Sequence, residues 1–399
     1  MKLLIYQWNS LTHEYIYKAL DEMGIEYNIV HYMGVKEMKK EEVLQAFIAQ
    51  TEKHIFEEGY DALFSINYID FLSQIAYHTG ILYICWSYDS PSLGGDPATH
   101  FYDTNRIFLF DSYEVEEHKK RDVPHVYHMN LAVDVKEMNK FKITPQEKLR
   151  LNSEISFVGQ LYRTEIAEAL ESLNSYKSAY VDALINIQMN TYDANLLREL
   201  MSEDFAYFLI DKNPEFEEHV KNSPRNKGEE GGIYSYAMLE NFLMRAVTSR
   251  ERILLLSLLS RNHGVKLFGF DKKIDPLENV IFAGPLDYKE EMPKLFPCSK
   301  INLNITVRSI QSAIPQRCLD VMACHGFLMT NYQHDLFTEL EDGVDMVVYY
   351  SIEDALEKAD FYLKHDKERE EIAMNGYKKM RDVLNYKNQL TKIFKISGL

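Results

Sequence analysis

The feature that most constrains the fold of this chain is a regular alternation of short apolar runs with longer amphipathic stretches. Runs of strand type occur at residues 3–9, 25–32, 61–67, 81–89, 105–111 and 125–133, and again at 154–161, 265–270, 279–284, 301–306, 327–332 and 344–350. Most of the intervening stretches have the period of a helix. Strand and helix repeated in this order predict parallel sheets with helices on both faces.

A break in the alternation predicts two domains. Residues 136–153 are rich in charge, contain Pro145, and are expected to form a linker. We therefore predict an α/β chain of two Rossmann-like, doubly wound domains that face each other across a cleft. The first domain covers residues 1–135 and the second 154–385, with a helical insertion at about 165–260. Residues 386–399 are expected to form a C-terminal tail.

The charge balance argues against nucleic acid as a partner of this chain. The chain has 44 Lys and Arg against 61 Asp and Glu, a net charge of −17, which makes it a poor general binder of nucleic acid. No apolar run approaches the ~20 residues that span a bilayer, although peripheral association with a membrane stays open. The first ten residues, MKLLIYQWNS, lack the pattern of a secretory signal, so we expect a cytoplasmic protein.

Several common motifs are missing from the sequence. There is no G-x-G-x-x-G fingerprint after the first strand, no P-loop and no G-x-S-x-G elbow. No Asp-x-Asp and no Cys-x-x-Cys occurs either, so no metal site and no cofactor is expected. A bound diphosphate would then be neutralised by helix N-termini and arginines.

The most informative segment is INLNITVRSIQSAIPQRCLD, residues 301–320. A strand is expected to end at Thr306, Arg308 follows in a loop, and Pro315 suits the first turn of a helix that carries Arg317 and Asp320. Two guanidinium groups near a helix start suit a diphosphate, and a carboxylate suits the hydroxyls of a ribose. The alternative is an Arg317–Asp320 ion pair on the surface of that helix.

This segment resembles the C-terminal glycosyltransferase domain of the spore-maturation (CgeB-like) family. The resemblance follows the pattern LN-x-T-x-R…IP-x-R-x-x-D-x-M-x-x-x-GF-L-x-TNY, with Leu303, Asn304, Thr306, Arg308, Ile314, Pro315, Arg317, Asp320, Met322, Gly326, Phe327, Leu328, Thr330, Asn331 and Tyr332. Residues 360–380 are similar to the closing helices of the family, and residues 64–68, 83–91 and 105–111 to the N-terminal domain fused to it. The resemblance implies a GT-B glycosyltransferase.

The resemblance also implies a mechanism. The second domain would bind a nucleotide diphosphate sugar, with UDP expected as the nucleotide, and Arg308, Arg317 and a helix N-terminus would stabilise the leaving diphosphate. Many retaining GT-B enzymes carry Glu-x7-Glu here, and aligning Asp320 with the second Glu puts Ser312 at the first. Because the sugar-facing carboxylate is lost, we expect transfer with inversion. The acceptor is expected in the cell envelope, on a spore surface or on a protein.

Two other strand ends are expected to reach the donor. Gly159 would let the backbone approach a phosphate, with Arg163 at the following helix start, and Gly269 would let backbone groups bond a base. The alternative for both glycines is a plain turn.

The first domain is expected to supply a general base for the acceptor hydroxyl. The candidates are His13 and Glu14 at the start of the first helix, and Asp89 after the fourth strand. The alternative is helix capping, with Thr12 or Asp89 as an N-cap and Glu14 as a first-turn acid.

We thus predict a metal-independent glycosyltransferase. The fold is also compatible with a nucleotide-sugar epimerase or hydrolase, and with a catalytically silent nucleotide-binding protein of an assembly complex.

Overall fold

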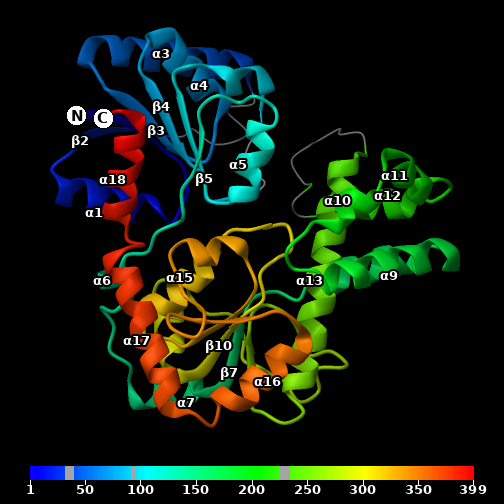
Figure 1. Ribbon diagram of the computed structural model, residues 1–399. Helices are drawn as coiled ribbons and strands as arrows, with labels where there is room; N and C mark the ends of the chain where they lie inside the picture. Colours follow the sequence, from blue (N-terminus) through cyan, green and yellow to red (C-terminus); the bar gives the residue numbers. More distant parts are fainter. Residues whose placement is uncertain (32–39, 91–94, 224–225, 227–233) are drawn as a thin grey trace. The chain divides into compact units, whose positions relative to one another are not determined.

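The computed structural model describes residues 1–31, 40–90, 95–223, 226 and 234–399, and it divides into two units (Figure 1). The first unit comprises Met1–Asp134, Ser312–Gln316 and Met380–Leu399. The second comprises Val135–Gln311 and Arg317–Lys379.

The first unit is built on a parallel six-stranded sheet in the order β2-β1-β3-β4-β5-β6. Its elements are β1 (Lys2–Gln7), α1 (His13–Met23), β2 (Glu26–His31), α3 (Glu41–Glu58), β3 (Ala62–Ile66), α4 (Asp70–Thr79), β4 (Leu82–Trp86), the 3-10 helix η1 (Pro97–Phe101), β5 (Asn105–Leu109), α5 (Ser112–Lys119), β6 (Val126–His128) and α18 (Tyr386–Ser397).

Alternate residues of these strands build two separate cores. Leu3 and Ile5 of β1 face one layer of helices, while Leu4 and Tyr6 face the other. The first layer contains α1 and α18, and the second contains α3, α4 and α5. A strand buried on both faces has to be apolar at nearly every position, which explains why β3, with sequence ALFSI, has no exposed residue.

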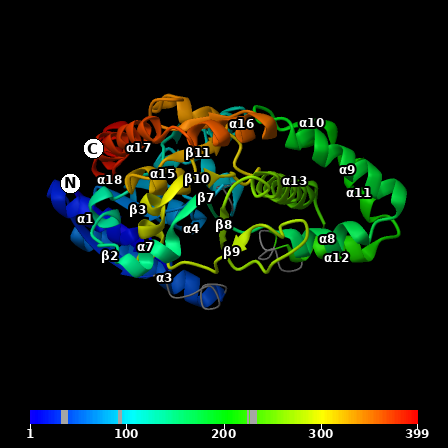
Figure 2. The ribbon, with the colours of Figure 1, turned by 90° about the horizontal axis from the view of Figure 1, so that it is seen from below.

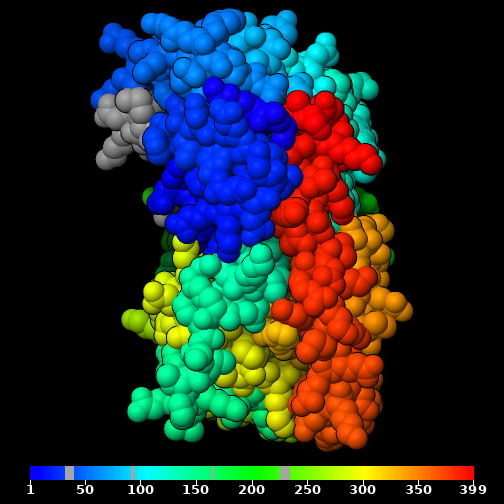
Figure 3. Space-filling model, turned by 90° about the vertical axis from the view of Figure 1, so that its left-hand side faces the viewer, coloured from blue at the N-terminus to red at the C-terminus, as the bar shows by residue number. Residues whose placement is uncertain are grey.

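The C-terminal helix α18 completes the first unit. It lies beside α1, where Tyr386 stacks on Tyr15 with ring centroids 5.6 Å apart (Figure 3). Leu390 and Ile393 are fully buried against the sheet. Residues 386–399, which the sequence suggested as a tail, are therefore part of the core of the first unit.

The second unit contains a second parallel six-stranded sheet in the order β12-β11-β10-β7-β8-β9. Its elements are α6 (Val135–Met138), α7 (Pro145–Leu151), β7 (Ser153–Val158), α8 (Arg163–Glu171), α9 (Ser175–Met189), α10 (Leu196–Leu200), α11 (Glu203–Ile210), α12 (Pro214–Asn222), α13 (Tyr236–Leu259), β8 (Val265–Phe268), β9 (Ile281–Phe282), α14 (Met292–Leu295), the 3-10 helix η2 (Phe296–Cys298), β10 (Ser299–Asn304), α15 (Gln316–Ala323), β11 (Leu328–Asn331), the 3-10 helix η3 (His334–Thr338), β12 (Val347–Tyr349), α16 (Ile352–Tyr362) and α17 (Asp366–Asp382).

The long helix α13 links the sheet of the second unit to the helical insertion. Its C-terminal half packs on the sheet through Leu255, Leu256 and Leu259. Its N-terminal half forms a second core with α8, α9, α10, α11 and α12, which extend away from the strands (Figure 2). Part of the segment between α12 and α13 lies outside the described residues.

The expected linker has structure of its own. Within residues 136–153, helix α7 begins with a complete capping box formed by Thr144 and Glu147, and β7 starts at Ser153. The prediction of an α/β chain with two doubly wound parallel sheets is confirmed.

Candidate functional site

The strand order of the second unit locates a candidate ligand site. The chain leaves β7 for β8 and β9 on one side, and later returns to β10 and β11 on the other. Ligands of open α/β sheets bind beyond the carboxyl ends of the strands where this reversal occurs. In this unit that point lies between β7 and β10, so the loops that begin at Gly159 and Ile305 border it.

Gly159 and Gly269 lie together at this edge of the sheet. The backbone N–H of Gly159 donates to the carbonyl of Phe268 across 3.1 Å. A Cβ atom at position 269 would lie 2.4 Å from the carbonyl oxygen of Gly159, and one at position 159 would lie 2.9 Å from the ring of Phe157. Gly269 is therefore required by close backbone packing and Gly159 by the ring of Phe157, and their contact with a nucleotide stays a prediction.

Two arginines of α13 organise the loop after β7, and the sequence analysis did not select them. Arg252 donates from Nη1 to the carbonyl of Gln160 across 2.6 Å, and from Nε and Nη2 to the carbonyl of Ile305 across 3.2 and 2.6 Å. It thereby joins the loops that follow β7 and β10. Arg245 lies over the ring of Tyr162, with Cζ 4.4 Å from the centroid.

Tyr162 occupies a strained position in this arrangement. Its φ of 58° is in the left-handed region, which non-glycine residues seldom adopt. The guanidinium of Arg252 also lies 5.2 Å from its ring, so two cations hold the side chain. The spacing of Arg245 and Arg252, two helical turns apart on a mostly apolar helix, is the signal in the sequence that could have identified this pair.

Arg308 does not occupy the role predicted for it. Its side chain is buried, with Nε bonded to Glu251 at 2.9 Å and Nη2 to the carbonyl of Met189 at 3.0 Å. Nη1 donates to the carbonyl of Thr191 at 3.2 Å, and the guanidinium lies 3.9 Å from the centroid of Tyr192. Because every nitrogen of the side chain has a partner within the protein, Arg308 fastens the loop after β10 to the insertion instead of presenting its charge to a diphosphate.

Arg317 differs from Arg308 in its surroundings. It lies in the first turn of α15, partly exposed, with Nη1 against Sδ of Met292 and the guanidinium over the ring of Phe296. No acidic side chain pairs with it among the described residues. The alternative of an ion pair with Asp320 is therefore wrong.

Asp320 lies on the same helix but is 1% exposed. Its Oδ1 atom accepts a hydrogen bond from the hydroxyl of Tyr288 across 3.1 Å. The carboxylate could accept further hydrogen bonds, but it is buried, and its contact with a ribose stays a prediction.

Ser312 belongs to the first unit and bonds to Asp111. Its Oγ atom donates to Oδ1 of Asp111 across 2.6 Å, and its backbone N–H donates to the same oxygen across 3.2 Å. Asp111 also caps α5 by accepting from the N–H of Tyr113. The residue aligned with a sugar-facing glutamate thus reinforces the cap of a helix.

The first unit has its own reversal of strand order, between β1 and β3. His13 opens α1 just after β1 and is 2% exposed. Its Nε2 lies 3.2 Å from the carbonyl of Tyr6, which can only accept. Burial lowers the pKa of His13, and the carbonyls of Tyr6 and Ser10 oppose this shift. The other ring nitrogen, Nδ1, is buried and has no hydrogen-bond partner among the described residues.

The other two candidate bases are exposed. Glu14 lies in the first turn of α1, where an acidic side chain suits the helix dipole, as the alternative to catalysis predicted. Thr12, the predicted N-cap, makes no capping hydrogen bond with its side chain. Asp89 follows β4 and accepts from Nδ2 of Asn67 across 2.7 Å. Asn67 follows β3, with φ 62°, and its Oδ1 accepts from the N–H of Tyr88. His13, Glu14 and Asp89 thus share the carboxyl edge of one sheet.

Two further properties concern metals and membranes. Within the described part of the chain, no three side chains of His, Cys, Asp or Glu come together in a way that could hold a metal ion. None of the described helices combines the length and the hydrophobicity needed to cross a membrane.

The sequence was compared with protein families and with curated proteins. Residues 242–395 match the family described as "Glycosyl transferase-like". No curated protein matches the chain in sequence.

Solved structures resemble the whole chain. HepE of Anabaena in complex with UDP-glucose has a TM-score of 0.51 at 9% identity, with 100% of each chain covered. Sucrose-phosphate synthase of Thermosynechococcus elongatus has a TM-score of 0.56 at 8% identity, covering 99% of this chain and 98% of that one. A glycosyltransferase of Rickettsia africae has a TM-score of 0.53 at 11% identity, covering 99% and 97%.

The fold of the chain is that of GT-B glycosyltransferases. The family match over α13 to α18 and this fold agree with the predicted enzyme class, glycosyltransferase. The CgeB-like subfamily is a finer assignment, and it stays a prediction.

Proposed function

We propose that this glycosyltransferase takes its sugar from a nucleotide diphosphate donor, with UDP as the nucleotide, and binds that donor on the second unit. The observation that carries the proposal is a pair of arginines without acidic partners among the described side chains. Arg163 opens α8, which follows β7, and Arg317 lies in the first turn of α15, the next helix after β10. The complex of HepE with UDP-glucose supports the same choice of donor.

The electrostatics of the site favour a diphosphate. Helices α8 and α15 have nine and eight residues, and the N-terminus of each carries the positive end of the helix dipole. An arginine at each N-terminus adds a full positive charge, and its planar fork can bind phosphate oxygens in pairs. Charge that develops on the leaving diphosphate would be stabilised by these groups without a metal ion.

Arg252 and Arg245 would hold the site in shape. Arg252 fixes the loops after β7 and β10 to each other, so the two helix starts keep their positions before the donor arrives. A preorganised site loses less conformational freedom on binding than one that has to order its loops.

The first unit would then provide the acceptor side. His13, whose Nδ1 has no hydrogen-bond partner among the described residues, is our first choice for the general base, ahead of Glu14 and Asp89. We propose inversion at the anomeric carbon, because Ser312 bonds to Asp111 where a retaining enzyme would carry a glutamate. The acceptor we propose is a glycan or protein of the cell envelope or the spore surface.

The test is equilibrium binding of UDP and a panel of UDP-sugars to the full chain. We expect Arg317→Gln and Arg163→Gln to weaken the binding of UDP roughly 10- to 150-fold each, as for the loss of a charged hydrogen bond. Arg121→Gln is the matched control, because Arg121 is an exposed arginine of the first unit and the donor is proposed to bind on the second. Unchanged affinity in both variants, or no binding of any nucleotide diphosphate sugar, would overturn the proposal.

A further inference from the structure

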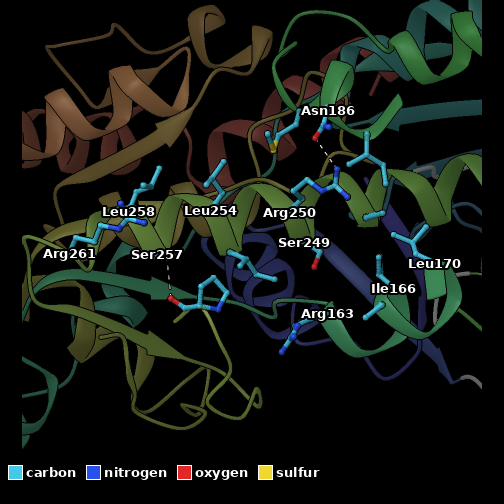
Figure 4. A pocket seen from close by; sticks show the side chains of 16 residues that line it. Arg163, Ile166, Leu170, Asn186, Ser249, Arg250, Leu254, Ser257, Leu258 and Arg261 are labelled. Carbon is cyan, nitrogen blue, oxygen red and sulfur yellow. Dashed lines mark hydrogen bonds between the residues drawn. The ribbon is translucent and has the colours of Figure 1, made fainter. Parts of the chain in front are cut away.

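The second unit contains a cavity that shares Arg163 with the proposed donor site and whose other lining residues the proposed reaction does not use. Helices α8, α9 and α13, together with Pro276, enclose about 540 Å³ (Figure 4). This volume is in the range of small-molecule sites, about 300–1,000 Å³. Most of the cavity wall is apolar, with side chains such as Ile166, Leu170, Leu254 and Leu258.

The cavity is elongated along α13. Its lining on that helix and just beyond it runs from Ala246 to Arg261, which corresponds to about 22 Å at 1.5 Å per residue. An extended chain fits this shape better than a compact ring system.

The charged residues around the cavity have one sign. Arg163, Arg250 and Arg261 line it, and no Asp or Glu is found among the described residues of the lining. This is unusual for a chain with 61 acidic and 44 basic residues. Arg250 is already paired with Asp182 at 2.5 Å, but Arg163 and Arg261 have no acidic partner among the described side chains.

The lining changes along the length of the cavity. Figure 4 shows Arg261 at one end and Ile166, Leu170 and Arg163 toward the other, with Leu258 and Leu254 along α13 on the side of Arg261. The apolar side chains would bury hydrocarbon along the cavity, and Arg261 would attract an anionic group at its end. An amphiphile with its charged group at Arg261 therefore matches the lining.

We propose that this cavity binds a lipid monophosphate, with a single acyl, alkyl or prenyl chain between α8, α9 and α13 and the phosphate at Arg261. The inference concerns binding alone, so it goes beyond the proposed sugar transfer and does not depend on it. A single chain is chosen because the cavity is long and limited in volume, and a phosphate because arginine binds phosphate oxygens in a bidentate fashion.

The experiment is calorimetric titration of the full chain, without nucleotide sugar, with octyl, decyl and dodecyl phosphate below their micellar concentrations. We expect Kd to fall about fourfold for each added methylene. Dodecyltrimethylammonium has the same hydrocarbon chain with a cationic head, and it should bind at least tenfold more weakly although the protein has a net charge of −17.

Variants separate the cavity from the rest of the surface. Leu254→Glu puts a carboxylate into the lining at a leucine that is 37% exposed, and its control is Leu149→Glu on α7, where the leucine is 82% exposed. Ala167→Phe fills the cavity without charge, in case the first variant fails to fold. Arg261→Gln should weaken the phosphate several-fold and leave the cationic amphiphile unchanged, with Arg121→Gln as control.

Three results would overturn the proposal. They are an affinity that does not depend on chain length, equal affinity for the cationic head, and unchanged binding in both Leu254→Glu and Ala167→Phe. None of them bears on the binding of UDP, so failure here is distinct from failure of the proposed function.

Discussion

The guanidinium of Arg308 and the carboxylate of Glu251 form an ion pair that is almost fully removed from solvent. Nε lies 2.9 Å from Oε2, and the two side chains are 5% and 0% exposed. The other carboxylate oxygen accepts from the hydroxyl of Tyr192 at 2.8 Å, and the ring of Tyr192 lies beneath the guanidinium. The pair ties the loop after β10 to α13, and so connects the insertion with the edge of the sheet where the donor is proposed to bind.

This pair predicts a marked asymmetry between single and double substitutions. Arg308→Met or Glu251→Leu alone should lower the free energy of unfolding by about 3–5 kcal/mol, because each leaves an uncompensated buried charge. The double variant should recover most of that loss. Urea-induced unfolding of the four proteins measures the cycle. Losses below about 1 kcal/mol in both single variants would mean that water reaches the pair.

Asp320 can be tested against its own hydrogen-bond partner. If its carboxylate exchanges the Tyr288 hydroxyl for a ribose, Asp320→Ala should weaken UDP and UDP-sugar alike, roughly 10- to 150-fold. Tyr288→Phe is the control, since it removes the competing donor and leaves the carboxylate. Calorimetric titration gives both affinities. Lower stability of Asp320→Ala with unchanged affinity would assign Asp320 to the structure of α15 alone.

Turnover is expected to continue in excess EDTA. The leaving diphosphate is proposed to be stabilised by Arg317, Arg163 and two helix N-termini, so no divalent ion has to share its charge. Release of UDP in the presence of acceptor, with and without EDTA, measures this. Activity abolished by EDTA and restored by Mn²⁺ or Mg²⁺ would contradict the proposed phosphate site.

The acceptor side makes a kinetic prediction. Replacing the general base should lower kcat by ~10²–10⁴-fold while the affinity for the donor stays nearly constant. We expect this pattern for His13→Ala, with Asp89→Asn and Glu14→Gln as the comparison variants. NMR of the first product should show an inverted anomeric centre. The donor's own configuration in that product would exclude inversion, and full activity in all three variants would place the base elsewhere.

His118 predicts how stability depends on pH. Burial lowers its pKa from the usual 6.5 to about 4, with Arg121 and His100 adding to the shift and Glu117 opposing it. Below pH 6.5 the unfolded chain binds a proton that the folded chain does not, so the free energy of unfolding falls as the pH falls toward 4. The loss from this one group is on the order of 3 kcal/mol, at 1.36 kcal/mol per pH unit. Urea unfolding of the wild type and His118→Gln between pH 7 and 4 should show a shallower slope in the variant; parallel slopes would contradict the prediction.

The sequence by itself determined the architecture. Runs such as LFSI at 63–66 and LNIT at 303–306 are apolar or β-branched at three of four positions, and such runs between helices suit a parallel sheet that is covered on both faces. The residues that follow the strands, such as Asp89 in the first sheet and Gly159 in the second, could therefore be assigned to the carboxyl edge of their own sheet without coordinates. This was possible because periodicity is a local property that can be read from neighbouring residues.

Only the tertiary structure decided what the charged residues do. The spacing of Arg308 and Arg317 in the sequence is compatible with two arginines that both bind phosphate. It is equally compatible with one that binds phosphate and one that holds the structure together. Arg308 has the structural role because it pairs with Glu251, 57 residues earlier in the chain. Ser312 meets Asp111 across 201 residues in the same way, and α18 joins the first unit although it lies at the end of the chain. Whether a charge is free or paired depends on which distant groups the fold brings within hydrogen-bond distance, and no local pattern of residues records that.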